Sequence, residues 1–110
     1  MSLVDGTVKK FADGECYIEF KEEDIVSKEV YIIQPTCKPV NDSVMELFLM
    51  VSAAKRAGAA SVNVVCPYFG YARSDRRFNG KAVPVSASDV VHILEGMGVN
   101  TLTTIDIHCR

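Results

Sequence analysis

The segment with the clearest capacity for chemistry spans residues 67–77. It places Arg73, Arg76 and Arg77 beside aromatic rings, directly after an apolar run. A guanidinium group binds phosphate well because its planar donors can engage two oxygens at once. The segment therefore suits a ligand that carries phosphate. A solvated loop over packed aromatics and a platform for single-stranded nucleic acid are the alternatives.

A second candidate lies near the C-terminal end, where Asp106 and His108 stand two residues apart on an expected strand. Side chains two apart on a strand leave the same face. A carboxylate and an imidazole on one face can contact a phosphate and its magnesium ion. A structural, hydrogen-bonded histidine explains the same pattern equally well. His92 falls inside an expected helix, and we interpret it as structural.

The third cluster is Phe11, Asp13 and Glu15 near the N-terminus. An aromatic ring can stack on a base while carboxylates accept hydrogen bonds from an exocyclic amine. Hairpins also contain an aromatic, an Asp-Gly turn and an acidic residue for reasons of folding alone. The pattern by itself therefore favours the structural interpretation.

The three clusters lie in or next to strands and turns that the sequence predicts. Alternating apolar residues predict strands over residues 7–11 and 15–20, and Asp13-Gly14 between them predicts a hairpin turn. Apolar runs over residues 30–33, 61–66 and 102–107 predict three further strands, and the first of these should be an interior strand buried on both faces.

Two helices are expected between these strands. Asn41, Asp42 and Ser43 are candidate N-caps of the first, and Gly58 ends it; Ser86, with Asp89 at capping-box spacing, starts the second, and Gly98 ends it. Alternating strands and helices predict an α/β fold with a parallel sheet and functional groups at the carboxyl ends of its strands.

Composition limits the class of protein. The chain has 110 residues, is 48% hydrophobic and carries a formal net charge of −2. One domain is the default at this size, and near-neutrality argues against broad attraction to nucleic acid or an anionic membrane. No run is long enough to span a membrane, so a soluble, cytoplasmic protein is expected. The four cysteines form no C-x-x-C pair, which favours reduced, mostly buried thiols.

Three stretches together resemble the ribose-phosphate pyrophosphokinase family. They are Lys9-Lys10-Phe11-Ala12-Asp13-Gly14-Glu15, the segment from Gln34-Pro35-Thr36-Cys37 to Met45-Glu46-Leu47, and residues 67–77. They agree with the family pattern in order and spacing, and the resemblance covers nearly the whole chain, as far as Asp106-Ile107-His108.

The resemblance implies a phosphoribosyltransferase-like domain, the N-terminal one of two in each subunit, and assembly into hexamers or related homo-oligomers. It implies transfer of pyrophosphate from Mg²⁺-bound ATP to ribose 5-phosphate. Phe11, Asp13 and Glu15 would approach the adenine of a neighbouring subunit. Arg73, with Ser74 and Asp75, would bind the polyphosphate, and His108 would stand at the magnesium and triphosphate site.

Some features depart from the family pattern. Ser74 replaces the usual glutamine, and residues 78–84 are about one residue longer. The first strand and helix of the family, and everything after His108, are expected to be missing, so we interpret the chain as truncated at both ends. We expect it to bind ATP weakly by itself, because the resemblance implies that adenine and phosphate contacts come from different subunits. Two alternatives stay open: a non-catalytic regulatory homologue that associates with active subunits, and an unrelated nucleotide-binding module.

Overall fold

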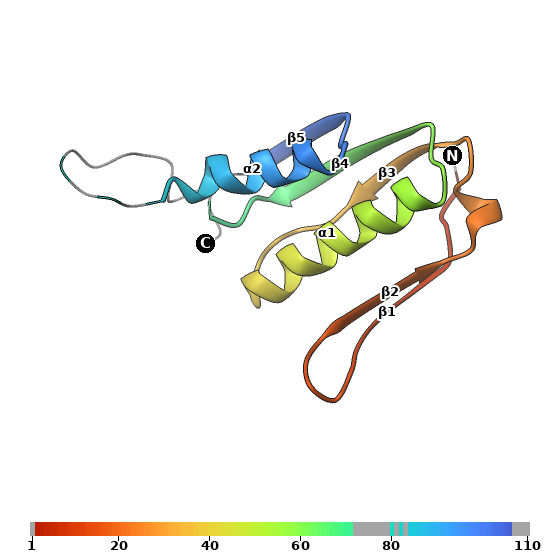
Figure 1. Ribbon diagram of the computed structural model, residues 1–110, viewed down its shortest axis with the longest axis horizontal. Helices are drawn as coiled ribbons and strands as arrows, with labels where there is room; N and C mark the ends of the chain where they lie inside the picture. Colours follow the sequence, from red (N-terminus) through yellow and green to blue (C-terminus); the bar gives the residue numbers. More distant parts are fainter. Residues whose placement is uncertain (1, 72–79, 81, 83, 107–110) are drawn as a thin grey trace.

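The computed structural model describes residues 2–71, 80, 82 and 84–106, and this part of the chain has two sheets, two α-helices and one short 3₁₀ helix, η1 (Figure 1). Strands β1 and β2 form an antiparallel hairpin, and the parallel sheet has the order β3-β4-β5. The elements are β1 (Gly6–Lys10), β2 (Cys16–Phe20), η1 (Glu22–Asp24), β3 (Glu29–Ile33), α1 (Val40–Arg56), β4 (Ser61–Tyr68), α2 (Ser86–Gly96) and β5 (Thr101–Asp106). The predicted α/β class, with a parallel sheet, flanking helices and an N-terminal hairpin, is confirmed.

Both helices pack on the same face of the parallel sheet. Ile32 lies opposite Val64, and Val64 lies opposite Leu102, so these side chains share one face. Successive right-handed crossovers that add strands in one direction place their helices on one side. The core between helices and sheet consists of Ile25, Ile32, Leu47, Val51, Ala54, Val62, Val64, Cys66, Phe69, Val90 and Leu94.

The opposite face of the sheet is open in the described part of the chain. Tyr31 is 46% exposed, Ile33 68% and Ile105 78%. The prediction that the first parallel strand is interior and buried on both faces is therefore wrong: β3 is an edge of the three described strands, and only its Val30 and Ile32 side packs on the core. An apolar run shows that a strand is hydrophobic but not which faces are covered.

The helix starts also differ from expectation. Helix α1 begins at Val40 with Pro39 in the N-cap position, and no side chain caps it. Asn41, Asp42 and Ser43 thus lie inside the first turn. Likewise Val85 is the N-cap residue of α2, without a side-chain cap, so Ser86 is not a cap.

The predicted helix ends are confirmed. Each helix is followed by a glycine in the left-handed region, Gly58 at φ 83° and Gly98 at φ 91°. Glycine adopts this conformation without the steric penalty that other residues meet.

The hairpin forms a layer outside α1. Strand β2 packs against α1, and Phe20 reaches the edge of the core. The turn of the hairpin lies on the same side of the molecule as the carboxyl ends of β3 and β4 and the start of α1 (Figure 1). The fold therefore gathers three segments of the sequence at one end.

Candidate functional site

The turn of the hairpin holds Phe11, Asp13 and Glu15 close together. The Phe11 amide donates to the Glu15 carbonyl at 2.8 Å, and the Gly14 amide donates to the Phe11 carbonyl at 2.9 Å. The Asp13 carboxylate accepts from the Glu15 amide at 3.0 Å. These bonds close the turn, and all three side chains stay exposed.

The Phe11 ring makes an edge contact within the hairpin. Its centroid lies 5.5 Å from that of Tyr17, with 65° between the ring planes. The Lys9 ammonium lies 5.1 Å from the centroid of Tyr17. Phe11 is still 48% exposed, so a planar ligand can stack against it.

At the carboxyl edge of the sheet, Thr36 joins the ends of β3 and β4. The Thr36 amide donates to the Tyr68 carbonyl at 3.0 Å, and its hydroxyl donates to the same carbonyl at 2.9 Å. The Gly70 amide donates to the Thr36 hydroxyl oxygen. Thr36 is 1% exposed, so these bonds are shielded from water. They fix the chain as it leaves β4.

Tyr71 follows this anchor and has an unusual backbone. Its φ is 71°, in the left-handed region that a bulky residue adopts only when its surroundings hold it there. Its hydroxyl donates to Oδ1 of Asn41, in the first turn of α1. Tyr71 is the last residue described before Arg73, and its hydroxyl contact fixes the end of this described segment.

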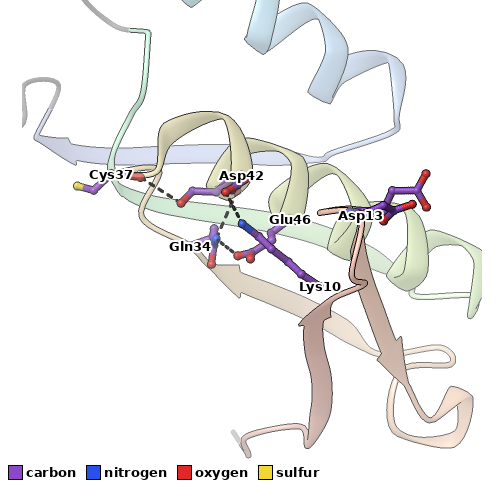
Figure 2. A network of polar contacts seen from close by, with 8 residues as sticks. Lys10, Asp13, Gln34, Cys37, Asp42 and Glu46 are labelled. Carbon is purple, nitrogen blue, oxygen red and sulfur yellow. Dashed lines mark hydrogen bonds and ion pairs between the residues drawn. The ribbon is translucent and has the colours of Figure 1, made fainter.

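A second side chain of the same turn contacts the hairpin. Lys10, the last residue of β1, donates to Asp42 in an ion pair (Figure 2). The hydrogen bond to Asp42 raises the pKa of Lys10. The two side chains are 43% and 39% exposed, so solvent weakens their attraction. Asp13 points away from the pair (Figure 2).

Gln34 extends this polar cluster to the end of β3. Its side-chain amide donates to Glu46 at 3.1 Å and to the Ser43 carbonyl at 3.3 Å. The Ser43 hydroxyl donates to the Cys37 carbonyl at 3.0 Å. The loop between β3 and α1 is thereby tied to the first two turns of the helix.

The cysteines follow the prediction in part. Cys66 is a buried free thiol near the carboxyl end of β4, and burial raises its pKa. Cys16 and Cys37 are only half-buried, because they lie on the hairpin and in a loop and not in the core. Cys109 lies outside the described residues.

The phosphate half of the expected site is not covered by the structure. Arg73, Ser74, Asp75 and His108 lie outside the described residues, as do Arg76 and Arg77. Strand β5 pairs with β4, with Asp106 opposite Tyr68, so Asp106 lies at the edge where β4 ends. In the described residues no group of three His, Cys, Asp or Glu side chains could hold a metal ion, and no helix is long and apolar enough to cross a membrane.

The comparison with protein families decides the family. Residues 1–98 match the model of the N-terminal domain of ribose phosphate pyrophosphokinase. The chain belongs to the ribose-phosphate pyrophosphokinase family. The resemblance seen in the three sequence stretches is thereby confirmed.

Individual relatives agree with this assignment. The chain is 45% identical over 110 residues to a ribose-phosphate pyrophosphokinase of Vibrio vulnificus, and 44% identical to one of Helicobacter hepaticus. These matches cover 100% of the chain and 35% of each relative, so the chain spans about a third of their length.

A solved structure gives the same result. The phosphoribosylpyrophosphate synthetase of Mycobacterium smegmatis superimposes with a TM-score of 0.88 and 29% identity, covering 98% of this chain and 36% of that one. That structure thus shares the fold described above.

The sequence did not reveal the contacts of Lys10, Thr36, Asn41 and Asp42. Asn41 and Asp42 were predicted only as helix caps. Contacts between residues 30 or more positions apart leave no mark in local spacing. The one available signal was the run of consecutive polar residues at a helix start.

Proposed function

We propose that the protein containing this chain transfers the pyrophosphoryl group of ATP to ribose 5-phosphate. The products are 5-phosphoribosyl 1-pyrophosphate and AMP. The observation that carries the proposal is the full-chain match to ribose-phosphate pyrophosphokinases. The exposed turn that holds Phe11, Asp13 and Glu15 supports the proposal, because these side chains are accessible to a ligand.

In this proposal the hairpin binds the base. Phe11 stacks on adenine, and the carboxylates of Asp13 and Glu15 accept hydrogen bonds from the exocyclic amine. One oxygen of Asp13 already accepts from the Glu15 amide, which orients the carboxylate. The base would belong to the site of a neighbouring subunit in a homo-oligomer, proposed to be a hexamer.

Arg73, with Ser74 and Asp75, binds the polyphosphate, and His108 stands at the magnesium and triphosphate site. Mg²⁺, when bound, neutralises phosphate charge. The anomeric hydroxyl of ribose 5-phosphate attacks the β-phosphorus in line, the bond from that phosphorus to the α-phosphate oxygen breaks, and AMP leaves. The hydroxyl proton is released. The contribution of the protein is positioning and charge stabilisation, without a covalent intermediate.

The site needs more than this chain. The base and phosphate contacts come from different subunits, and the ribose 5-phosphate contacts come mostly from a second domain. We therefore propose that the 110-residue chain alone is inactive and binds ATP weakly. The complete protein is proposed to be a cytoplasmic enzyme.

The test is an assay of the full-length protein with Mg²⁺, ATP and ribose 5-phosphate, followed by ³¹P NMR. Equal amounts of phosphoribosyl pyrophosphate and AMP are expected. Formation of ADP and a phosphorylated sugar would contradict the proposal, because it would show transfer of a single phosphoryl group. No turnover alone, together with coassembly with an active pyrophosphokinase, would identify a regulatory homologue.

A further inference from the structure

The first turn of α1 contacts both segments that carry the candidate site. Asn41 accepts from Tyr71, at the start of the segment leading to Arg73, and Asp42 accepts from Lys10, next to Phe11. Consecutive helical residues point about 100° apart, so neighbouring positions reach different segments. One turn of helix therefore holds two parts of the sequence that lie more than 60 positions apart.

We propose that Asn41 and Asp42 are positioning residues for the pyrophosphokinase site, an inference that rests on the proposed function. Asp42 sets the hairpin turn through Lys10, and Asn41 sets the chain at Tyr71. Neither residue touches the substrate. Their effect is on the orientation of these two segments, which contribute to the sites of neighbouring subunits.

The helix start leaves these side chains available for this role. Because α1 begins at Val40 and has no side-chain cap, Asn41 and Asp42 are not used as caps. The helix dipole favours a carboxylate in the first turn, where Asp42 meets the Lys10 ammonium.

The contacts act close to the residues that they would position. Lys10 directly precedes Phe11, and Tyr71 is two residues from Arg73. The Thr36 and Gly70 anchor holds the other side of the Tyr71 segment, so release of the Tyr71 hydroxyl frees one of two attachments. Misplacing a binding group by about 1 Å can cost a large part of a catalytic rate.

If these contacts served only to stabilise the fold, their loss would lower the melting temperature of the protein. Lys10 and Asp42 are about half exposed and lie outside the core cluster. Exposed ion pairs contribute little to folding because solvent screens their attraction. Loss of the pair should therefore leave the melting temperature of the protein almost unchanged while it loosens the hairpin turn.

The first experiment measures ATP kinetics in the full-length protein. Lys10→Met, Asp42→Asn and the double variant form a double-mutant cycle, and Tyr71→Phe tests the second contact. We expect KM for ATP to rise about two- to fivefold in each single variant, with the melting temperature changed by less than about 3 °C. The double variant should be no worse than Lys10→Met.

Two controls make the same chemical changes elsewhere. Lys21→Met removes an exposed lysine at the far end of the hairpin, and Tyr31→Phe removes a hydroxyl that donates to Glu29 on the open face of the sheet. Neither should change KM. Additive losses in the cycle, or equal effects in the controls, would overturn the inference.

Hydrogen exchange gives a readout that does not depend on activity. Amides of Phe11 and Gly14 should exchange about two- to fivefold faster in Lys10→Met, and the Gly70 amide should do so in Tyr71→Phe. Unchanged exchange in both variants would overturn the inference even in an active enzyme. If the wild-type protein forms no phosphoribosyl pyrophosphate, the proposed function is wrong. The exchange rates would still show whether Asn41 and Asp42 hold the two segments in place.

Discussion

The Thr36 hydroxyl donates a 2.9 Å hydrogen bond to the Tyr68 carbonyl, and this contact joins the carboxyl end of β3 to that of β4. The same hydroxyl oxygen accepts from the Gly70 amide. One buried side chain thus fixes the chain on its way to the arginine segment. Local structure at this edge depends on a residue 32 positions away.

Replacement of Thr36 by valine should destabilise the protein. Valine keeps the shape but leaves the buried Gly70 amide without its acceptor, at a cost of about 1–3 kcal/mol. Thr36→Ser keeps the hydroxyl and should cost less. Denaturant unfolding of both variants measures the difference. Equal losses would mean that the methyl group contributes as much stability as the hydroxyl.

Gly70 should not tolerate a side chain. A Cβ there would lie 2.9 Å from the Thr36 carbonyl oxygen and 2.9 Å from Cγ1 of Val40. Gly70→Ala is therefore expected to cost about 1–3 kcal/mol of unfolding free energy. The matched control is Gly96→Ala, where nothing lies within 4 Å and a helical alanine should stabilise by up to about 1 kcal/mol. The same sign for both variants would contradict this packing.

The buried thiol of Cys66 should react slowly. Burial raises its pKa, so little thiolate forms at pH 8, and access requires local opening. In the folded protein, iodoacetamide should modify Cys66 about tenfold or more slowly than Cys16, measured by mass spectrometry of the peptides. Comparable rates would show that the sheet edge opens readily.

The same thiol should make stability depend on pH. The pKa of the thiol is higher in the folded state than in the unfolded state, so the unfolded state loses the proton first as pH rises. The free energy of unfolding therefore begins to fall once pH exceeds the unfolded-state thiol pKa of about 8.5. Unfolding free energy should thus fall above that pH, and Cys66→Ala, although less stable overall, should show a smaller fall. An unchanged slope in the variant would assign the effect to other groups.

Phe11 should matter for ATP and little for folding. The ring is 48% exposed, and stacking on a base contributes about 1–3 kcal/mol in other base-binding proteins. In the full-length protein Phe11→Ala should therefore raise KM for ATP about fivefold or more. Val8→Ala removes a residue of similar exposure, 50%, from the adjoining strand and should leave KM unchanged. Equal effects would point to general loosening of the hairpin.

Much of the fold followed from local patterns. The alternation around Ile18 predicted a strand, Asp13-Gly14 predicted the turn, and Gly58 and Gly98 marked the helix ends, because each rule acts within a few residues. The face of β3 that stays open could not be predicted, since it depends on which side both crossovers take.

The candidate site was predictable only in its residue types. Phe11, Asp13 and Glu15 do share one turn, as their spacing indicated. Asn41 and Asp42 were assigned to capping because local rules favour polar residues there. The helix in fact starts earlier, and their partners Tyr71 and Lys10 come from distant segments.

We propose that Arg73 and His108 bind the polyphosphate of a purine nucleotide at one end of the sheet, while the aromatic hairpin of a neighbouring subunit binds the base. A crystal structure of the full-length protein with Mg²⁺ and a non-hydrolysable ATP analogue tests it most directly. We predict that Arg73 and His108 of one subunit both contact the polyphosphate and that Phe11 of a neighbouring subunit stacks on the adenine. Arg73 and His108 on opposite sides of the molecule would contradict the claim.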